Sequence, residues 1–171
     1  MGFELETVKA EQKEALLNLA EFYIYHFSEI KDIDLNEQGR WDFYPVQTYV
    51  EAEEKGKHAF FVRVEGKLAG FVLVSKLSDA DQIEHSIDEF FIMAKYRGRG
   101  LGQAVATEMF DRFPGRWRAF ELIGNVSAIS FWRRVIDVYT NGKYQETKVN
   151  EGGASGYMQK FSTLDKGSVQ S

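Results

Sequence analysis

The sequence predicts one α/β domain in which helices cover a mixed β-sheet. Two observations lead to this fold class. The 171 residues are 44% hydrophobic and 27% charged, which is the composition of an ordinary globular domain and not of a disordered or fibrous chain. Apolar residues then recur with strand and helix periods in the order β-α-α-β-β-β-α-β-α-β-β, which is typical of a mixed sheet covered by helices.

The N-terminal part predicts one strand and two helices. A short apolar alternation at 3–8 indicates the strand. Residues 11–27 carry apolar side chains at spacings of three and four, which predicts an amphipathic helix. A polar stretch at 28–45 separates this helix from a second one at 46–55, which ends before a glycine.

The middle of the chain predicts three strands and a third helix. The segments 58–64 and 67–75 are rich in β-branched and aromatic residues, and Glu65-Gly66 between them forms an acceptable hairpin turn. Another strand is expected at 82–93. Residues 100–113 place their apolar side chains on one helical stripe, so they predict a helix that follows this strand.

The C-terminal part predicts a strand, a helix and a final hairpin. The strand is expected at 117–123 and the helix at 127–136. Segments 143–149 and 155–161 then form the hairpin. Because no linker interrupts the chain, we expect one domain over residues 1–162, followed by a flexible C-terminal tail at 163–171.

Composition and charge exclude several classes of protein. The chain has no cysteine, which excludes disulfides and thiolate metal sites, and its three histidines have no usual zinc spacing, so we expect no metal. The net charge of −5 argues against a nucleic-acid partner. Neither a membrane-length apolar run nor a signal-peptide pattern is present, so we expect a cytoplasmic protein that binds no membrane.

The most informative segment is the glycine-rich turn at 94–103, which joins a predicted strand to a predicted helix. Gly98, Gly100 and Gly102 let the backbone approach a ligand closely. The first N–H groups of the following helix have no partner within the helix, and with the helix dipole they form an anion site. Arginines on both sides of Gly98 add positive charge, so phosphate, and in particular pyrophosphate, is the expected ligand.

The glycine spacing excludes two other phosphate-binding loops. A Walker loop ends in Gly-Lys-Ser/Thr, which is missing here. The pattern Gly98-x-Gly100-x-Gly102 also differs from the Gly-x-Gly-x-x-Gly of a dinucleotide fingerprint. An ordinary strand-to-helix turn with solvated arginines is the alternative to a phosphate site.

Two motifs carry a family resemblance, namely Arg97-x-x-Gly100-x-Gly102 and Asn125-x-x-Ala128-x-x-Phe131-Trp132. The first is similar to the acyl-CoA signature of the GNAT superfamily of acyl-CoA-dependent N-acyltransferases, and the second is similar to the second CoA-side motif of that superfamily. The order of elements is also similar over residues 1–161. The resemblance implies a GNAT-like fold, in which four helices flank a mostly antiparallel sheet of six to seven strands, and N-acetyltransferase activity with acetyl-CoA as co-substrate.

The resemblance also implies which residues bind CoA. Backbone amides of the turn would hold the pyrophosphate, and they belong to Arg97, Gly98, Arg99, Gly100, Leu101, Gly102 and Gln103. The backbone of the preceding strand end would pair with the pantetheine arm as an added strand, and that strand end comprises Phe91, Ile92 and Met93. An amide near Ile92 would also face the thioester oxygen.

The second motif has a structural alternative for each residue. Asn125 would bind the CoA arm or cap the helix that follows it. Phe131 and Trp132 would flank CoA, although an amphipathic helix explains them equally well as core residues.

Acetyl transfer to an amine needs a base, and Glu89 and Glu121 are the first candidates for catalytic carboxylates. Strand alternation places Glu89 on the same face as Phe91. Structural ion pairs are the alternative for both carboxylates. Trp132 stands where many relatives carry tyrosine, so the acid would be another tyrosine, a water or nothing. This departure leaves open a non-catalytic module that binds or senses acyl-CoA.

The loop between the first two helices shapes the acceptor pocket in GNAT proteins. Here it holds acidic and aromatic side chains and one arginine, namely Glu29, Asp32, Asp34, Glu37, Arg40, Trp41, Asp42, Phe43 and Tyr44. Carboxylates attract a cation and aromatic faces hold it. We therefore expect a small-molecule acceptor with a basic amine, which attacks the thioester directly in a ternary complex. A solvated loop with inward-packed aromatics explains the same residues, and a homodimer is left open.

Overall fold

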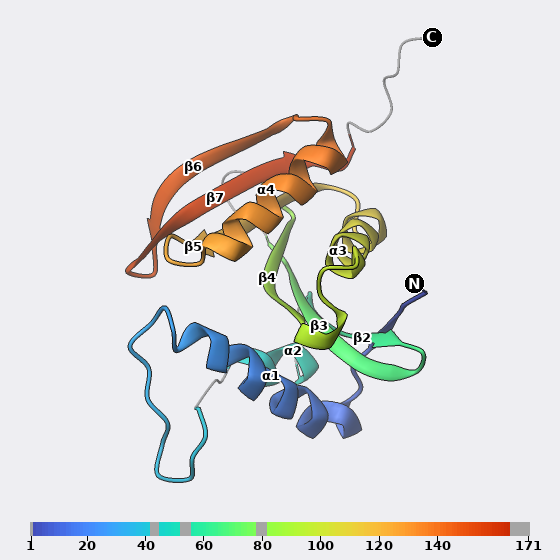
Figure 1. Cartoon of the computed structure of the whole chain (residues 1–171). Coiled ribbons are helices and arrows are strands. Elements are labelled where there is room, and N and C mark those ends of the chain that lie inside the picture. Colours follow the sequence, from blue (N-terminus) through green and yellow to red (C-terminus); the bar gives the residue numbers. More distant parts are fainter. Residues whose placement is uncertain (1, 42–44, 52–55, 78–81, 165–171) are drawn as a thin grey trace. The chain divides into compact units, whose positions relative to one another are not determined.

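The computed structural model describes residues 2–41, 45–51, 56–77 and 82–164. Within these ranges it contains seven strands, hydrogen-bonded in the order β1-β2-β3-β4-β5-β7-β6, and helices α1 to α4 (Figure 1). The predicted mixed, mostly antiparallel sheet with four helices is confirmed. The chain divides into two compact units, of which the first comprises Met1–Ser75 with Glu89–Arg99 and the second Lys76–Asp88 with Gly100–Ser171.

The first unit contains an antiparallel arrangement of β1, β2 and β3. Its elements are β1 (Glu4–Thr7), α1 (Lys13–Phe27), α2 (Pro45–Glu51), β2 (Lys57–Val64) and β3 (Lys67–Lys76). The strands β1 and β3 both pair with β2. The predicted hairpin turn between β2 and β3 is confirmed, because Glu65 and Gly66 both have positive φ, at 51° and 74°.

One face of these strands carries the core of the first unit. The cross-strand pairs Ala59–Leu73 and Phe61–Phe71 place four apolar side chains on this face. Leu16, Leu19 and Ala20 of α1 and Val46 and Tyr49 of α2 belong to the same buried cluster, together with Phe91 of β4 (His85–Ile92). Packing against α1 therefore fixes the face of β4 that carries Phe91.

The second unit is built on the C-terminal strands. Its elements are α3 (Leu101–Arg112), β5 (Arg116–Leu122), α4 (Val126–Thr140), β6 (Tyr144–Glu151) and β7 (Ala154–Ser162). β7 pairs antiparallel with both β5 and β6, while β5 pairs in parallel with the start of β4, at His85, Ser86 and Ile87. Figure 1 shows α4 lying along this C-terminal sheet. The ring of Phe110 lies edge-on to Trp117 and Phe161, with centroid distances of 5.2 and 4.9 Å.

Several element ends differ from the sequence prediction by one or two residues, and two differ by more. The helix expected at 127–136 continues to Thr140, since Tyr139 and Thr140 are buried, and it ends where Asn141 adopts a left-handed conformation (φ 53°). The strand expected at 82–93 begins only at His85, because Gln82 has a φ of 59°, which no strand residue adopts.

The end of β7 is anchored to the start of β5. The N–H group of Thr163 donates to Gly115 O at 2.9 Å, and the N–H group of Gly115 donates to Thr163 Oγ1 at 2.8 Å. Thr163, the first residue of the predicted tail, is therefore buried and hydrogen-bonded, while residues 165–171 lie outside the described residues. The prediction of one domain over 1–162 stays a prediction. No helix in the described ranges combines the length and hydrophobicity that a membrane span requires.

Candidate active site

The glycine-rich turn follows directly after β4. A short 3-10 helix, Ala94–Tyr96, leads from the strand end into Gly98 and Gly100, whose φ angles are 75° and 80°. Residues with a side chain are strained in this left-handed region, so the backbone of the turn requires glycine at both positions. The boundary between the two compact units falls within the turn, between Arg99 and Gly100.

The start of α3 presents N–H groups that helix geometry leaves without a partner. The helical hydrogen bonds begin where Ala104 N–H donates to Gly100 O at 3.0 Å. Leu101, Gly102 and Gln103 precede this first bond, so their N–H groups have no acceptor within the helix. A Cβ atom on Gly98 or Gly100 would meet nothing within 4 Å. The backbone there is open to a bound group, which fits the predicted phosphate-binding role.

The Arg97 side chain turns back toward the strand end. Its Nε donates to Ile92 O at 2.6 Å, and one guanidinium nitrogen lies 3.3 Å from His26 Nε2 of α1. Its guanidinium carbon lies 5.8 Å from the ring centroid of Phe91. Arg97 therefore connects β4, α1 and the turn within the first unit, while Arg99 is exposed.

The strand end that was assigned to the pantetheine arm is held close to β3. A Cβ on Gly70 would lie 2.0 Å from Phe91 O, so only glycine allows the two backbones to approach this closely. The N–H group of Met93 donates to Ala69 O at 2.8 Å. Phe91 and Ile92 are buried and Met93 is partly buried. The position of the whole segment within the first unit is thus set by β3 on one side.

Glu89 is partly buried on β4 and is engaged by a residue that the sequence analysis missed. The hydroxyl of Tyr23 in α1 donates a hydrogen bond to Glu89 Oε2. Glu89 and Phe91 both contact Tyr23, so the prediction that they share one face of the strand is confirmed. In the sequence, Tyr23 is one member of the apolar stripe of a helix, and nothing in that pattern marks its hydroxyl.

Glu121 lies in the second unit and is only 4% exposed. Among the described residues, none hydrogen-bonds to either of its carboxylate oxygens within ordinary geometry. Burial raises the pKa of Glu121 from 4.5 to about 8, and this effect outweighs the lowering by the Gln159 amide and by Arg133. Glu121 therefore binds a proton far more readily than an exposed glutamate does.

A polar network lies on the same face as Glu121. Gln159 Nε2 donates to Glu146 Oε2 at 2.7 Å, and Arg133 of α4 donates three hydrogen bonds to the Glu146 carboxylate, at 2.6, 2.8 and 3.2 Å. Arg133 lowers the pKa of Glu146 through these bonds. Because the register places Gln159 opposite Ala119, two residues before Glu121, α4 and this network cover one face of β5, β7 and β6.

The second motif is placed entirely in the second unit. Asn125 caps α4, since its Oδ1 accepts from Ala128 N–H at 3.2 Å. Trp132 is 6% exposed and its ring lies 6.4 Å from Phe110. Phe131 packs edge-on against Trp132 at 5.0 Å. The core and capping roles of these residues are visible, and their contacts with CoA stay predictions.

The acidic loop after α1 is tied to that helix by Glu21. Its carboxylate accepts hydrogen bonds from Arg40 Nε at 3.4 Å and from Trp41 N–H at 3.3 Å. The Trp41 ring lies 6.3 Å from Tyr25. The acidic side chains of the loop are exposed, and they are Glu29, Asp32, Asp34 and Glu37. Three of the residues expected to shape the acceptor pocket, Asp42, Phe43 and Tyr44, lie outside the described residues.

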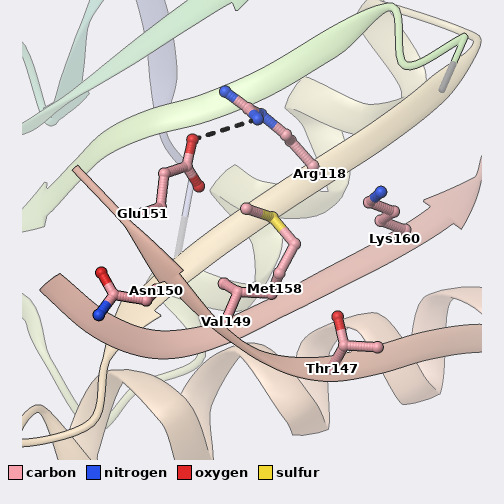
Figure 2. Close-up of a pocket in the computed structure, with 7 residues that line it drawn as sticks. All are labelled: Arg118, Thr147, Val149, Asn150, Glu151, Met158 and Lys160. Atoms are coloured by element: carbon pink, nitrogen blue, oxygen red, sulfur yellow. Dashed lines mark ion pairs between the residues drawn. The ribbon is translucent and has the colours of Figure 1, made fainter. Parts of the chain in front are cut away.

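A cavity of about 220 Å³ lies on the β5–β7–β6 sheet, on the face opposite Glu121. Figure 2 shows Arg118 of β5 directed toward Glu151 of β6, with which it forms an ion pair at 3.3 Å. The remaining lining residues are Thr147, Val149, Asn150, Met158 and Lys160. None of the predicted site residues lines this cavity.

Comparison with known proteins identifies the family. The chain matches the profile of the acetyltransferase (GNAT) family over residues 19–136. None of the curated proteins matches it. The chain belongs to the acetyltransferase (GNAT) family. The family that the sequence resemblance predicted is thereby confirmed, while the roles of the individual motif residues stay predictions.

Solved structures share the fold at low sequence identity. A GNAT family acetyltransferase from Streptococcus agalactiae has a TM-score of 0.69 at 18% identity, covering 94% of this chain and 96% of that one. The PaiA N-acetyltransferase from Thermoplasma acidophilum, in complex with coenzyme A, has a TM-score of 0.65 at 12% identity, covering 94% and 100%. AAC(6')-Ib, in complex with paromomycin and acetyl-CoA, has a TM-score of 0.68 at 12% identity, covering 100% and 99%.

Proposed function

We propose that this acetyltransferase transfers an acetyl group from acetyl-CoA to the primary amine of a small molecule, by direct attack in a ternary complex. The observation that supports this most strongly is the turn at Gly98 and Gly100. Its left-handed glycines leave open space beside the backbone and lead into the unpaired N–H groups of α3. Both features suit the pyrophosphate of CoA.

In this proposal, the CoA contacts come from backbone more than from side chains. The Arg97 N–H group already donates to Ala94 O at 3.2 Å, so the amides of residues 98–103 hold the pyrophosphate, and Arg99 adds an exposed positive charge. The Arg97 side chain stabilises the turn through the hydrogen bond that its Nε donates to Ile92 O. The backbone of Phe91, Ile92 and Met93 pairs with the pantetheine arm through groups other than the Met93 N–H, which donates to Ala69 O, and the N–H group near Ile92 faces the thioester oxygen.

The chemistry requires two protons to leave the acceptor nitrogen. The acceptor enters as an ammonium ion and gives one proton to a carboxylate base. The nitrogen lone pair then attacks the thioester carbonyl carbon, the C–N bond forms and the C–S bond breaks. CoA leaves as a thiolate, and the second proton from nitrogen ends on its sulfur. The indole of Trp132 cannot supply that proton at neutral pH, so we assign its delivery to water.

Glu89 and Glu121 are the candidates for the base, and their pH behaviour separates them. A base with the raised pKa of Glu121 would give activity that increases as the pH approaches about 8. Loss of activity in Glu121→Gln together with that pH profile would assign the base to Glu121. Loss in Glu89→Gln, without an increase of activity toward pH 8, would assign it to Glu89.

We further propose that the acceptor is a cationic amine. The exposed carboxylates of the loop after α1 support this, because they would concentrate a positively charged substrate. One relative by fold, AAC(6')-Ib, was solved with the aminoglycoside paromomycin. A panel of polyamines, aminoglycosides, amino acids and lysine peptides tests the acceptor class, and turnover with neutral or acidic acceptors alone would contradict it.

The decisive experiment combines CoA binding with turnover. We expect CoA to raise the melting temperature and acetyl-CoA with a basic amine to release free thiol. Gly100→Val should abolish CoA binding, because its φ of 80° strains a β-branched residue by about 1–3 kcal/mol and the added side chain enters the open space. Gly152→Val, at a glycine of the β6–β7 turn with φ 57°, is the matched control and should retain binding. Unchanged affinity in Gly100→Val would refute the assigned turn.

A non-catalytic module that binds acyl-CoA is the second candidate. The observation that favours it is Trp132, a buried indole at the position where many relatives carry a tyrosine phenol. Stabilisation by CoA without thiol release on any amine of the panel would support this second function.

A further inference from the structure

We propose that Tyr23 is a positioning residue that orients Glu89 as the base of the reaction, an inference that rests on the proposed function. α1 lies against the face of β4 that carries Glu89 and Phe91. From this helix the Tyr23 hydroxyl donates a hydrogen bond to Glu89 Oε2. Tyr23 and Glu89 are 66 residues apart in sequence, and both belong to the first unit.

Within the described ranges, three aromatic rings pack against the ring of Tyr23. Its centroid lies 4.8 Å from Phe27, 5.7 Å from Phe71 and 6.0 Å from Phe91, and all three contacts are edge-on. Such contacts, together with burial, fix the plane of the ring. The hydroxyl therefore points in a direction that the core determines, and the carboxylate of Glu89 takes its orientation from this donor.

The Tyr23 hydroxyl stays protonated at every physiological pH. Burial, the charge of Glu89 and the hydrogen bond to Glu89 together raise the pKa of Tyr23 well above 10. A permanent donor at Oε2 favours the ionised form of Glu89, which is the form a base needs. Ionisable groups near this strand end in the described part of the chain include His26 and Arg97, which contact Phe91 on the same face, and Asp88 on the opposite face of β4.

The hydrogen bond from Tyr23 to Oε2 keeps the Glu89 carboxylate ionised, as a base must be. One proton moves from the acceptor ammonium ion to this carboxylate, and the nitrogen lone pair becomes available for attack on the thioester. Without the hydroxyl, the Glu89 side chain can rotate away, and its carboxyl group holds a proton more tightly.

The variant Tyr23→Phe removes the hydroxyl and keeps the ring in its aromatic contacts. A hydrogen bond to a charged group corresponds to a factor of about 10 to 100, so we expect kcat to fall about tenfold or more at pH 7. The acid limb of the pH profile of kcat/KM should move upward by about one unit, while KM for acetyl-CoA stays unchanged. Tyr144→Phe on β6 is the matched control and should leave both kcat and the profile as in the wild type.

A double variant separates positioning from a structural role. If Tyr23 acts through Glu89, Glu89→Gln with Tyr23→Phe should lose no more activity than Glu89→Gln alone. Additive losses, an unchanged acid limb, or full activity of Glu89→Gln would each overturn the proposal. Circular dichroism and the melting temperature show whether each variant folds.

A ligand-free measurement distinguishes failure of this proposal from failure of the proposed function. NMR titration of the Glu89 carboxyl carbon should show a higher pKa in Tyr23→Phe than in the wild type. Equal values would refute the coupling even in an active enzyme. If the pKa of Glu89 is shifted but the protein acetylates no amine and releases no thiol, the proposed function is refuted. The hydrogen bond between Tyr23 and Glu89 then exists but has no catalytic use.

Discussion

Glu121→Gln tests the most unusual electrostatic feature of the second unit. A folded-state pKa of about 8, against 4.5 for an ordinary glutamate, means that the folded protein keeps a proton that the unfolded chain releases between these pH values. The wild type therefore loses stability as the pH rises through this window. At about 1.36 kcal/mol per pH unit, the loss reaches about 5 kcal/mol at pH 8 and above. A neutral glutamine of similar shape lacks this dependence.

Urea unfolding followed by circular dichroism measures this difference. We expect the free energy of unfolding of Glu121→Gln, minus that of the wild type, to increase steadily between pH 5 and pH 8, because the wild type becomes less stable. The two free energies of unfolding can also differ by an amount that does not depend on pH, because burying the glutamine amide has a free-energy cost of its own. The prediction is tested only by how the difference changes with pH. Glu14→Gln, at an exposed position of α1, is the matched control and should show no slope. A pH-independent difference between Glu121→Gln and wild type would refute the reasoning.

Two further substitutions test the cap and the core of the second unit. Asn125→Ala removes the cap of α4 and should lower the free energy of unfolding by about 1 kcal/mol in urea titrations. Asn125→Ser keeps a capping side chain and should retain most of this stability. If Asn125→Ala also lowers the affinity for CoA in calorimetry, Asn125 contacts CoA. Phe110→Ala should lower stability by about 3–5 kcal/mol, since the ring is fully buried against Trp117 and Phe161, and a loss below 1 kcal/mol would contradict the packing described.

Periodicity and turn chemistry were sufficient to predict most of the fold. The Glu65-Gly66 turn could be predicted because few residues adopt positive φ, and α1 because its apolar stripe repeats with the helical period. The end of α4 could not, since it depends on the burial of Tyr139 and Thr140 and on the left-handed conformation of Asn141. Burial against distant strands is decided by tertiary packing, which local sequence does not contain.

The candidate site was predictable only where local backbone decides it. The glycines of the turn indicate in the sequence where the backbone adopts left-handed conformations, and strand alternation places Glu89 on the same face as Phe91. The partner of Glu89 could not be predicted, because Tyr23 reaches it through the packing of α1 on β4. The high pKa of Glu121 was equally hidden, since alternation assigns a face to a residue but does not say what covers that face.

The contact at Gly70 has a consequence for how this protein can change. A side chain there would collide with Phe91 O, and a backbone carbonyl cannot rotate aside as a long side chain can. In a mutational library at Gly70, nearly every variant other than the parent would therefore fail to fold. Redesign of the enzyme for a new acceptor can therefore substitute residues of the exposed acidic loop but not Gly70 of β3.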